Sequence, residues 1–189
     1  MANAMQELMD MRIWFPWRLE KDKNGNPTKV LFAISGGSSG TNKEWSHTWG
    51  TYKDALEARE KYHAAGVGFK VPENYFFLDI DDRELSDPLV QTLLARFDSY
   101  SEYSFSGNGI HIYGKCEFSK LPTYINKEGK TRLDNQFYQN NRKIGLELYV
   151  GGITNRFAAY TGNIIEDKPL MECTAAVLTT LDKNMRKAK

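Results

Sequence analysis

The chain has 189 residues, of which 41% are hydrophobic and 13% aromatic, so it can bury a sizeable core, and we expect a single domain with two lobes. The formal net charge of +1 excludes a surface that is basic throughout, so an anionic partner would have to bind a local patch. Two cysteines are too few for a disulfide framework or a zinc site, and they indicate free thiols in a reducing compartment.

The N-terminal segment mixes charged and apolar residues too early to form a signal-peptide core. No apolar run approaches the roughly 20 residues that a membrane span needs. We therefore expect a soluble, cytoplasmic protein without a membrane partner.

Two apolar runs near the start of the chain, residues 12–20 and 29–34, flank the dipeptide Asn24-Gly25 and predict a β-hairpin. The Gly- and Ser-rich segment that follows, residues 36–43, lacks the glycine and Gly-Lys-Ser/Thr spacing of a phosphate-binding loop. We expect a flexible loop there.

Two helices are expected on the basis of their capping residues. The first covers residues 51–66, with Thr51 as its N-cap and Gly66 at its C-terminal end. The second has Asp87 as its N-cap and Pro88 in its first turn. Its apolar stripe consists of Leu89, Val90, Leu93, Leu94 and Phe97.

The other expected elements are mainly strands. They are a strand at residues 75–81, two strands about a Gly-rich turn at 103–114, strands at 144–150 and 156–162, and a last helix at about 169–186. The polar stretch at 119–142 is expected to be a long loop or a small excursion. We predict an α+β fold: an RRM-like antiparallel sheet with helices on one face at about residues 71–189, and a smaller N-terminal accessory lobe at about 10–70, together one domain over 1–189.

Alternation along three of these strands separates polar side chains from apolar ones. Asp79 and Asp81 point to one face of their strand, and their apolar neighbours point to the other. His111 and Glu147 alternate with apolar residues in the same way. If the strands share one sheet, these four side chains converge on its open face.

Three carboxylates held close together repel one another at neutral pH unless a cation lies among them. Ligands that are all oxygens favour hard ions, so we expect Mg²⁺ or Mn²⁺ at Asp79, Asp81 and Glu147. For each residue alone, the alternative is an ordinary polar side chain that faces solvent. The combination favours the metal site.

The segment SFSGNGIHI suits a phosphate-bearing substrate. Ser106 is a hydroxyl donor, the glycines around it, including Gly107, let backbone N–H groups approach an anion, and His111 is a further donor. Arg156 and Lys115 are candidate cations for phosphate or for a nucleic-acid backbone. The alternatives are a plain hairpin turn for the segment and a plain surface role for Lys115.

Four motifs occur in order: TWGTYKDALEA, then GVGF leading to FFLDIDD, then SYSEYSFSGNGIHI, then GLELYVGG with RFAAYTGN. Together they resemble the N-terminal catalytic domain of phage and plasmid primase-polymerases, within the archaeo-eukaryotic primase superfamily. The resemblance spans about residues 14–163. It implies an RRM-like catalytic half, a smaller accessory half, and template-directed nucleotide addition with two divalent metals.

By matching motif, the resemblance implies that Asp79, Asp81 and Glu147 are catalytic metal ligands, that Ser106 and His111 hold the triphosphate, and that Arg156 lies near the nucleotide. The implied partners are a single-stranded DNA template with a primer, nucleoside triphosphates, and a downstream helicase region or protein. The candidate template contacts in the accessory half are Arg12, Trp14, Trp17, Arg18 and Lys29, and the aromatic residues among them serve equally well as core.

Two other functions stay open. An RRM-like sheet can bind bases without a metal, which would make the chain a non-catalytic single-stranded nucleic-acid-binding replication module. An aspartyl-phosphate hydrolase also carries a DxD motif, with the first Asp as nucleophile and the second as acid/base. The small residue and turn expected after that motif are replaced here by Asp82, Arg83 and Glu84.

Overall fold

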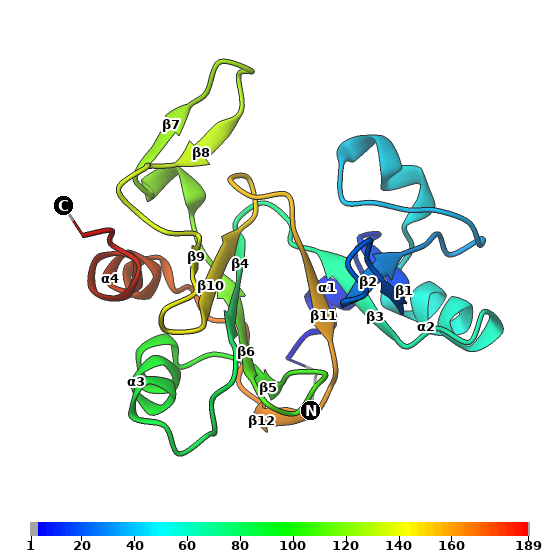
Figure 1. Cartoon of the computed structure of the whole chain (residues 1–189), viewed down its shortest axis with the longest axis horizontal. Helices are drawn as coiled ribbons and strands as arrows, with labels where there is room; N and C mark the ends of the chain where they lie inside the picture. The colour runs from blue at the N-terminus through cyan, green and yellow to red at the C-terminus, as the bar shows by residue number, and fades with distance from the viewer. Residues whose placement is uncertain (1–3, 189) are drawn as a thin grey trace. The chain divides into compact units, whose positions relative to one another are not determined.

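The computed structural model describes residues 4–188 and divides into two compact units (Figure 1). The first unit consists of Met1–Lys70 and Phe157–Thr161, and the second of Val71–Arg156 and Gly162–Lys189. The predicted domain also includes residues 1–3 and 189, which lie outside the described part of the chain. The sequence did not indicate that residues 157–161 return to the first unit.

The first unit is a four-stranded antiparallel sheet in the order β11-β3-β1-β2, with helix α2 packed against β1 and β3. Its elements are α1 (Gln6–Met9), β1 (Trp14–Lys21), β2 (Pro27–Leu31), a 3-10 helix (Lys43–Thr48), α2 (Tyr52–Lys61), β3 (Gly66–Lys70) and β11 (Phe157–Tyr160). The predicted β1–β2 hairpin is confirmed. In its turn, Asp22 Oδ1 accepts hydrogen bonds from the N–H groups of Asn24 and Asn26, and Gly25 adopts a φ of +84°.

Helix α2 begins where the sequence predicts and ends earlier. The Thr51 hydroxyl accepts a hydrogen bond from the Asp54 N–H, and the Asp54 carboxylate accepts one from the Thr51 N–H. The prediction that Gly66 ends this helix is wrong, because α2 stops at Lys61 and Gly66 begins β3. A Cβ at Gly66 would lie 2.6 Å from the Trp17 ring, so the close approach of β1 requires the glycine.

The two aromatic residues among the candidate template contacts are core residues. Trp14 and Trp17 are 0% and 1% exposed. Their indole N–H groups donate to the backbone carbonyls of Leu8 and Val67, at 2.6 and 3.0 Å. A core role is the alternative that the sequence left open for these two side chains.

The second unit contains a six-stranded antiparallel sheet in the order β12-β5-β6-β4-β10-β9. Its strands are β4 (Tyr75–Ile80), β5 (Ser101–Tyr103), β6 (Ile110–Lys115), β9 (Asn140–Asn141), β10 (Leu146–Val150) and β12 (Ile164–Glu166). Helix α3 (Pro88–Phe97) connects β4 to β5, and β6 lies between these two strands. The middle order β10-β4-β6-β5 is the strand order of a βαββαβ unit, although residues 116–145, between β6 and β10, contain no α-helix. With its antiparallel sheets and separate helices, the protein has the predicted α+β fold.

Helices α3 and α4 (Thr174–Asn184) lie on the same side of this sheet (Figure 1). Asp87 caps α3 as predicted, accepting a hydrogen bond from the Leu89 N–H at 2.7 Å. The apolar side chains of β4, β6 and β10 pack against the two helices and form the core of the unit. Helix α4 is shorter than the predicted segment at 169–186, because its N-cap is Cys173.

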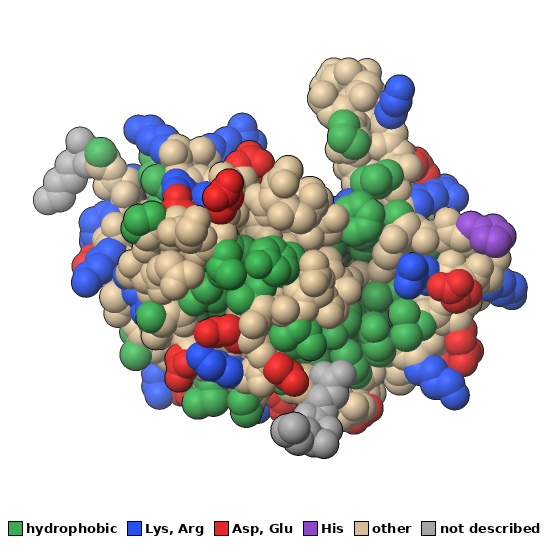
Figure 2. All heavy atoms as spheres, turned by 90° about the horizontal axis from the view of Figure 1, so that it is seen from below, with side chains coloured by type: hydrophobic (Ala, Val, Ile, Leu, Met, Phe, Trp, Pro, Cys, Tyr) green, Lys and Arg blue, Asp and Glu red, His purple; other side chains and the backbone are tan. Residues whose placement is uncertain are grey.

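A small excursion lies between β6 and β10. It contains a 3-10 turn (Phe118–Lys120), the hairpin of β7 (Thr123–Ile125) and β8 (Thr131–Leu133), and β9. None of the helices within residues 4–188 is both long enough and apolar enough to cross a membrane. On the face drawn in Figure 2, Lys and Arg side chains are interspersed with Asp and Glu, which agrees with the low net charge.

Candidate active site

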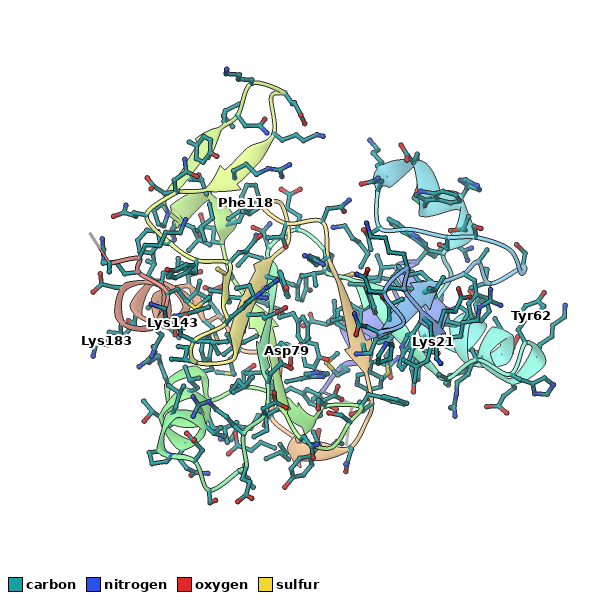
Figure 3. All side chains as sticks on the ribbon, in the orientation of Figure 1. Lys21, Tyr62, Asp79, Phe118, Lys143 and Lys183 are labelled. Atoms are coloured by element: carbon teal, nitrogen blue, oxygen red, sulfur yellow. The ribbon has the colours of Figure 1, made fainter. Side chains whose placement is uncertain are left out.

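A row of polar side chains crosses the sheet of the second unit on the face opposite α3 and α4. The strand register pairs Glu102 with His111, His111 with Asp79, Asp79 with Glu147, and Glu147 with Asn140. Residues directly opposite each other on antiparallel strands lie on the same face. These five residues therefore form one continuous row over β5, β6, β4, β10 and β9, which we call the polar row; Figure 3 labels Asp79 on its central strand.

Three residues that the sequence predicted to converge are neighbours in the polar row. His111 Nε2 lies 3.5 Å from Asp79 Oδ1. The Asp79 side chain is 22% exposed, and the His111 side chain is 3% exposed. On the other side of Asp79, Glu147 is its direct partner across the strand pair. The fourth predicted residue, Asp81, is exposed just beyond the end of β4, where its N–H donates to the Gly145 carbonyl at 2.8 Å.

The Glu147 carboxylate is held by two neighbours. Its Oε1 accepts a hydrogen bond from Asn140 Nδ2, and its Oε2 accepts one from the Tyr149 hydroxyl. Burial of Tyr149, reinforced by its bond to Glu147, raises the pKa of the phenol far above its usual value of 10. Tyr149 therefore stays protonated at neutral pH and remains a donor to Glu147.

Glu102 is a member of the polar row that the sequence analysis missed. Its side chain is completely buried, and its two oxygens lie within hydrogen-bonding distance of four donors. The donors are Tyr100, His111, Tyr113 and Gly162. The available signal was a charged residue in the serine- and tyrosine-rich segment 99–104, between α3 and the glycine-rich turn, but its partners depend on the strand register.

An aromatic row runs beside the polar row on the same face, two residues along each strand. The Phe77 ring lies between those of Tyr113 and Tyr149, with centroid distances of 5.2 and 6.1 Å and interplanar angles of 15° and 25°. The two hydroxyls each reach an acid of the polar row: Tyr113 donates to Glu102 at 3.0 Å, and Tyr149 donates to Glu147. The aromatic row thus orients carboxylates on both sides of Asp79.

Ser106 and Gly107 lie in the turn at residues 104–109, between β5 and β6. Ser106 Oγ accepts a hydrogen bond from the Asn108 N–H at 3.3 Å, and Gly107 has a φ of +78°, which requires glycine. The Asn108 carbonyl accepts a hydrogen bond from the Arg83 N–H at 3.1 Å. The structure therefore brings this turn next to the segment that follows Asp81.

The two predicted cations occupy different places. The Arg156 guanidinium carbon lies 5.5 Å from the centroid of the Tyr149 ring, so this exposed side chain is on the Glu147 side of the polar row. Lys115 is four residues from His111 along β6, roughly 13 Å at strand spacing. It lines a separate hollow with residues that include Glu117 and Glu172, so the structure does not bring it to the polar row.

The donor chemistry of the site fits a hard divalent cation. Asp79 and Glu147 offer only oxygen atoms, and their like charges lie directly opposite each other, an arrangement that a cation offsets. As the side chains stand, however, no three His, Cys, Asp or Glu residues between positions 4 and 188 are grouped to surround a metal ion. For Glu147 to bind a metal beside Asp79, it would have to exchange one of its hydrogen bonds.

Comparison with known proteins agrees with the motifs. No protein-family model matches the chain. Over 172 residues, the chain is 26% identical to a protein named DNA Primase-polymerase from Nitratiruptor phage NrS-1. The match covers 87% of this chain and 21% of that protein, so the chain spans about a fifth of the length of the curated relative. Over most of its length, this chain is therefore similar to part of a phage DNA primase-polymerase, which supports membership of a primase-polymerase family.

Proposed function

We propose that this chain is the catalytic part of a template-dependent DNA primase-polymerase that adds nucleotides to a primer, or starts one, in phage or plasmid replication. The observation that carries the proposal is the opposed pair Asp79 and Glu147, with His111 beside it, in the middle of the sheet. The similarity to the phage protein supports the same class of reaction. The substrates would be nucleoside triphosphates and a primed single-stranded DNA template.

In this proposal Asp79, Asp81 and Glu147 hold Mg²⁺ or Mn²⁺. When bound, the metal supplies positive charge that favours ionisation of the attacking hydroxyl and neutralises the departing pyrophosphate. The chain itself holds the metal-binding carboxylates in position. The aromatic row holds Glu147 through Tyr149, and the strand register fixes Asp79 beside it.

The triphosphate would lie at the end of β4, near the turn at residues 104–109. His111 would donate from Nε2 in its doubly protonated form, since Nδ1 carries the proton that faces Glu102. Ser106 and the Gly107 N–H would contact the phosphates from the turn. Arg156, resting on the Tyr149 ring, would supply a cation on the other side. We assign Lys115 no contact with the nucleotide, because it lies at the far end of β6. A downstream helicase region or protein belongs to the proposal as a partner in starting primers.

The two alternative functions have less support. RRM-like sheets bind bases by stacking them on exposed aromatic faces, but here the neighbouring rings of Tyr113 and Tyr149 flank both faces of Phe77. An aspartyl-phosphate hydrolase needs its nucleophile open to attack by a phosphoester. Asp79 lies instead inside β4, paired with strands on both sides.

Primer extension tests the proposal. The protein is incubated with a labelled primer, a template, deoxynucleotides or ribonucleotides, and Mn²⁺ or Mg²⁺. The variants are Asp79→Ala and Asp81→Ala, and the matched control is Glu117→Gln, which removes an exposed acid of the same unit. We expect metal-dependent extension that both alanine variants lose and the control keeps. Template binding that does not depend on metal, without any extension, would support the nucleic-acid-binding module instead. Release of phosphate from a small phosphoester would support the hydrolase.

A further inference from the structure

We propose that Glu102 is a positioning residue that fixes the ring of His111, so that Nε2 faces Asp79 and the place of the incoming triphosphate. The part of this inference that concerns the nucleotide rests on the proposed function. The orientation of the ring does not depend on it.

The Glu102 carboxylate is fully buried, and hydrogen bonds from the chain offset the cost of burying it. Its side chain is 0% exposed, and burying a carboxylate is costly unless hydrogen bonds satisfy its oxygens. Oε1 lies 3.0 Å from the Tyr113 hydroxyl and 3.2 Å from His111 Nδ1. Oε2 accepts from the Gly162 N–H at 2.9 Å and from the Tyr100 hydroxyl at 3.3 Å. Both oxygens therefore receive donors from the chain itself.

This arrangement selects one orientation of the histidine ring. An ionised carboxylate can only accept hydrogen bonds, so the contact with Glu102 places a proton on His111 Nδ1. The opposite nitrogen, Nε2, then faces Asp79 Oδ1 at 3.5 Å. A ring turned by 180° would present carbon atoms to both acids and would deprive buried Glu102 of a donor. Phe77 also packs edge-on against the ring, with centroids 5.0 Å apart at 84°.

Tyr113 supports the same contact. Its hydroxyl lies 3.1 Å from His111 Nδ1 and donates to Glu102. Burial, followed by the charge of Glu102, raises the pKa of Tyr113 well above its usual value, so the phenol stays a donor. A purely structural role for Glu102, joining β5 to the backbone at Gly162, is the rival explanation.

Proton NMR of the protein without nucleotide tests the orientation. His111 is one of three histidines, and His111→Gln identifies its ring signals. We expect a downfield Nδ1–H resonance that exchanges slowly with water. In Glu102→Gln, whose neutral amide is a weaker acceptor, the resonance should move upfield and exchange at least about tenfold faster. In Tyr113→Phe it should persist. An unchanged resonance in Glu102→Gln, or one lost only in Tyr113→Phe, would overturn the assignment.

A double-mutant cycle tests the consequence for the nucleotide. Affinity for a fluorescent nucleoside triphosphate is measured in Mg²⁺ buffer, without a reaction. Glu102→Gln should weaken binding about tenfold in the wild-type background and less than about twofold in a His111→Ala background, since its effect passes through that ring. Leu93→Ala, a change in the core on the opposite face, should leave affinity within about twofold and serves as the control for lost stability.

The outcomes separate the two hypotheses. An equal loss of affinity in both backgrounds would overturn the positioning role, because Glu102 would then act without His111. If the wild-type protein binds no triphosphate, the proposed function fails, and the NMR resonance still decides whether Glu102 fixes the ring.

Discussion

Replacing Glu147 with glutamine should separate catalysis from stability. Glu147→Gln keeps the size of the side chain while removing its charge. Its amide oxygen can still accept from Asn140 Nδ2, and the Tyr149 hydroxyl, which donates to Glu147 in the native protein, can rotate to accept from the new NH₂ group. The local hydrogen bonds can thus survive without the negative charge.

The expected change in stability follows from two opposing effects. Residues directly opposite in a strand pair have Cβ atoms about 5 Å apart, and two unit charges at that separation repel by roughly 3 kcal/mol at an effective dielectric constant of about 20. The partial exposure of Asp79, at 22%, reduces this repulsion to about 1–2 kcal/mol. Against that gain, two hydrogen bonds to a charged acceptor become neutral ones, which costs about 0.5–1 kcal/mol each. The free energy of unfolding should therefore change by less than about 1 kcal/mol.

Catalysis should respond very differently. A metal ligand contributes several kcal/mol to the transition state, so we expect primer extension to fall at least about a hundredfold. Urea unfolding, Mn²⁺ binding and primer extension are measured on the same samples, with Glu117→Gln as the control for the loss of one negative charge. Extension within about tenfold of wild type, together with unchanged Mn²⁺ affinity, would refute the role of Glu147. A variant that is unfolded under the assay conditions would instead refute the stability calculation.

Three further predictions concern other parts of the chain. Tyr149→Phe removes a donor that orients Glu147, so Mn²⁺ affinity should fall by about 10- to 100-fold in a calorimetric titration, and an unchanged affinity would show that the hydroxyl does not orient this ligand. Thr51→Ala removes the N-cap of α2 and should lower the free energy of urea unfolding by about 1 kcal/mol, whereas no loss would contradict the capping role. Burial raises the pKa of the Cys116 thiol to about 11 and that of Cys173 to about 12, from 9, so the folded state keeps protons that the unfolded state releases. Under reducing conditions, the two thiols should leave the free energy of unfolding unchanged below about pH 9 and lower it above that pH. The fall should be steeper than in the variant with both cysteines changed to alanine. Parallel pH curves for the two proteins would refute this.

The local features of this protein could be predicted from its sequence. The caps at Thr51 and Asp87 depend on residues within a few positions, and both form as expected. The alternation that turns Asp79, His111 and Glu147 away from their apolar neighbours is likewise a property of each strand alone. The sequence therefore showed which side chains lie on the face opposite the helices, but not that His111 is buried there. The α+β class followed from the order of the elements.

Long-range pairing decided the rest. Glu102 joins the polar row because β5 pairs with β6 in one particular register, and a slip of one residue would turn its side chain to the other face. Tyr113 reaches Glu102 only because β6 pairs with β5. Phe77 stacks between Tyr113 and Tyr149 only because β6 and β10 flank β4. The return of β11 to the sheet of the first unit depends on its hydrogen bonds with β3, about ninety residues earlier in the chain. The alternation of side chains along a strand and the capping of a helix are set by neighbours in sequence. Strand order and register are set by hydrogen bonds and packing between distant segments, and only the tertiary structure contains those contacts.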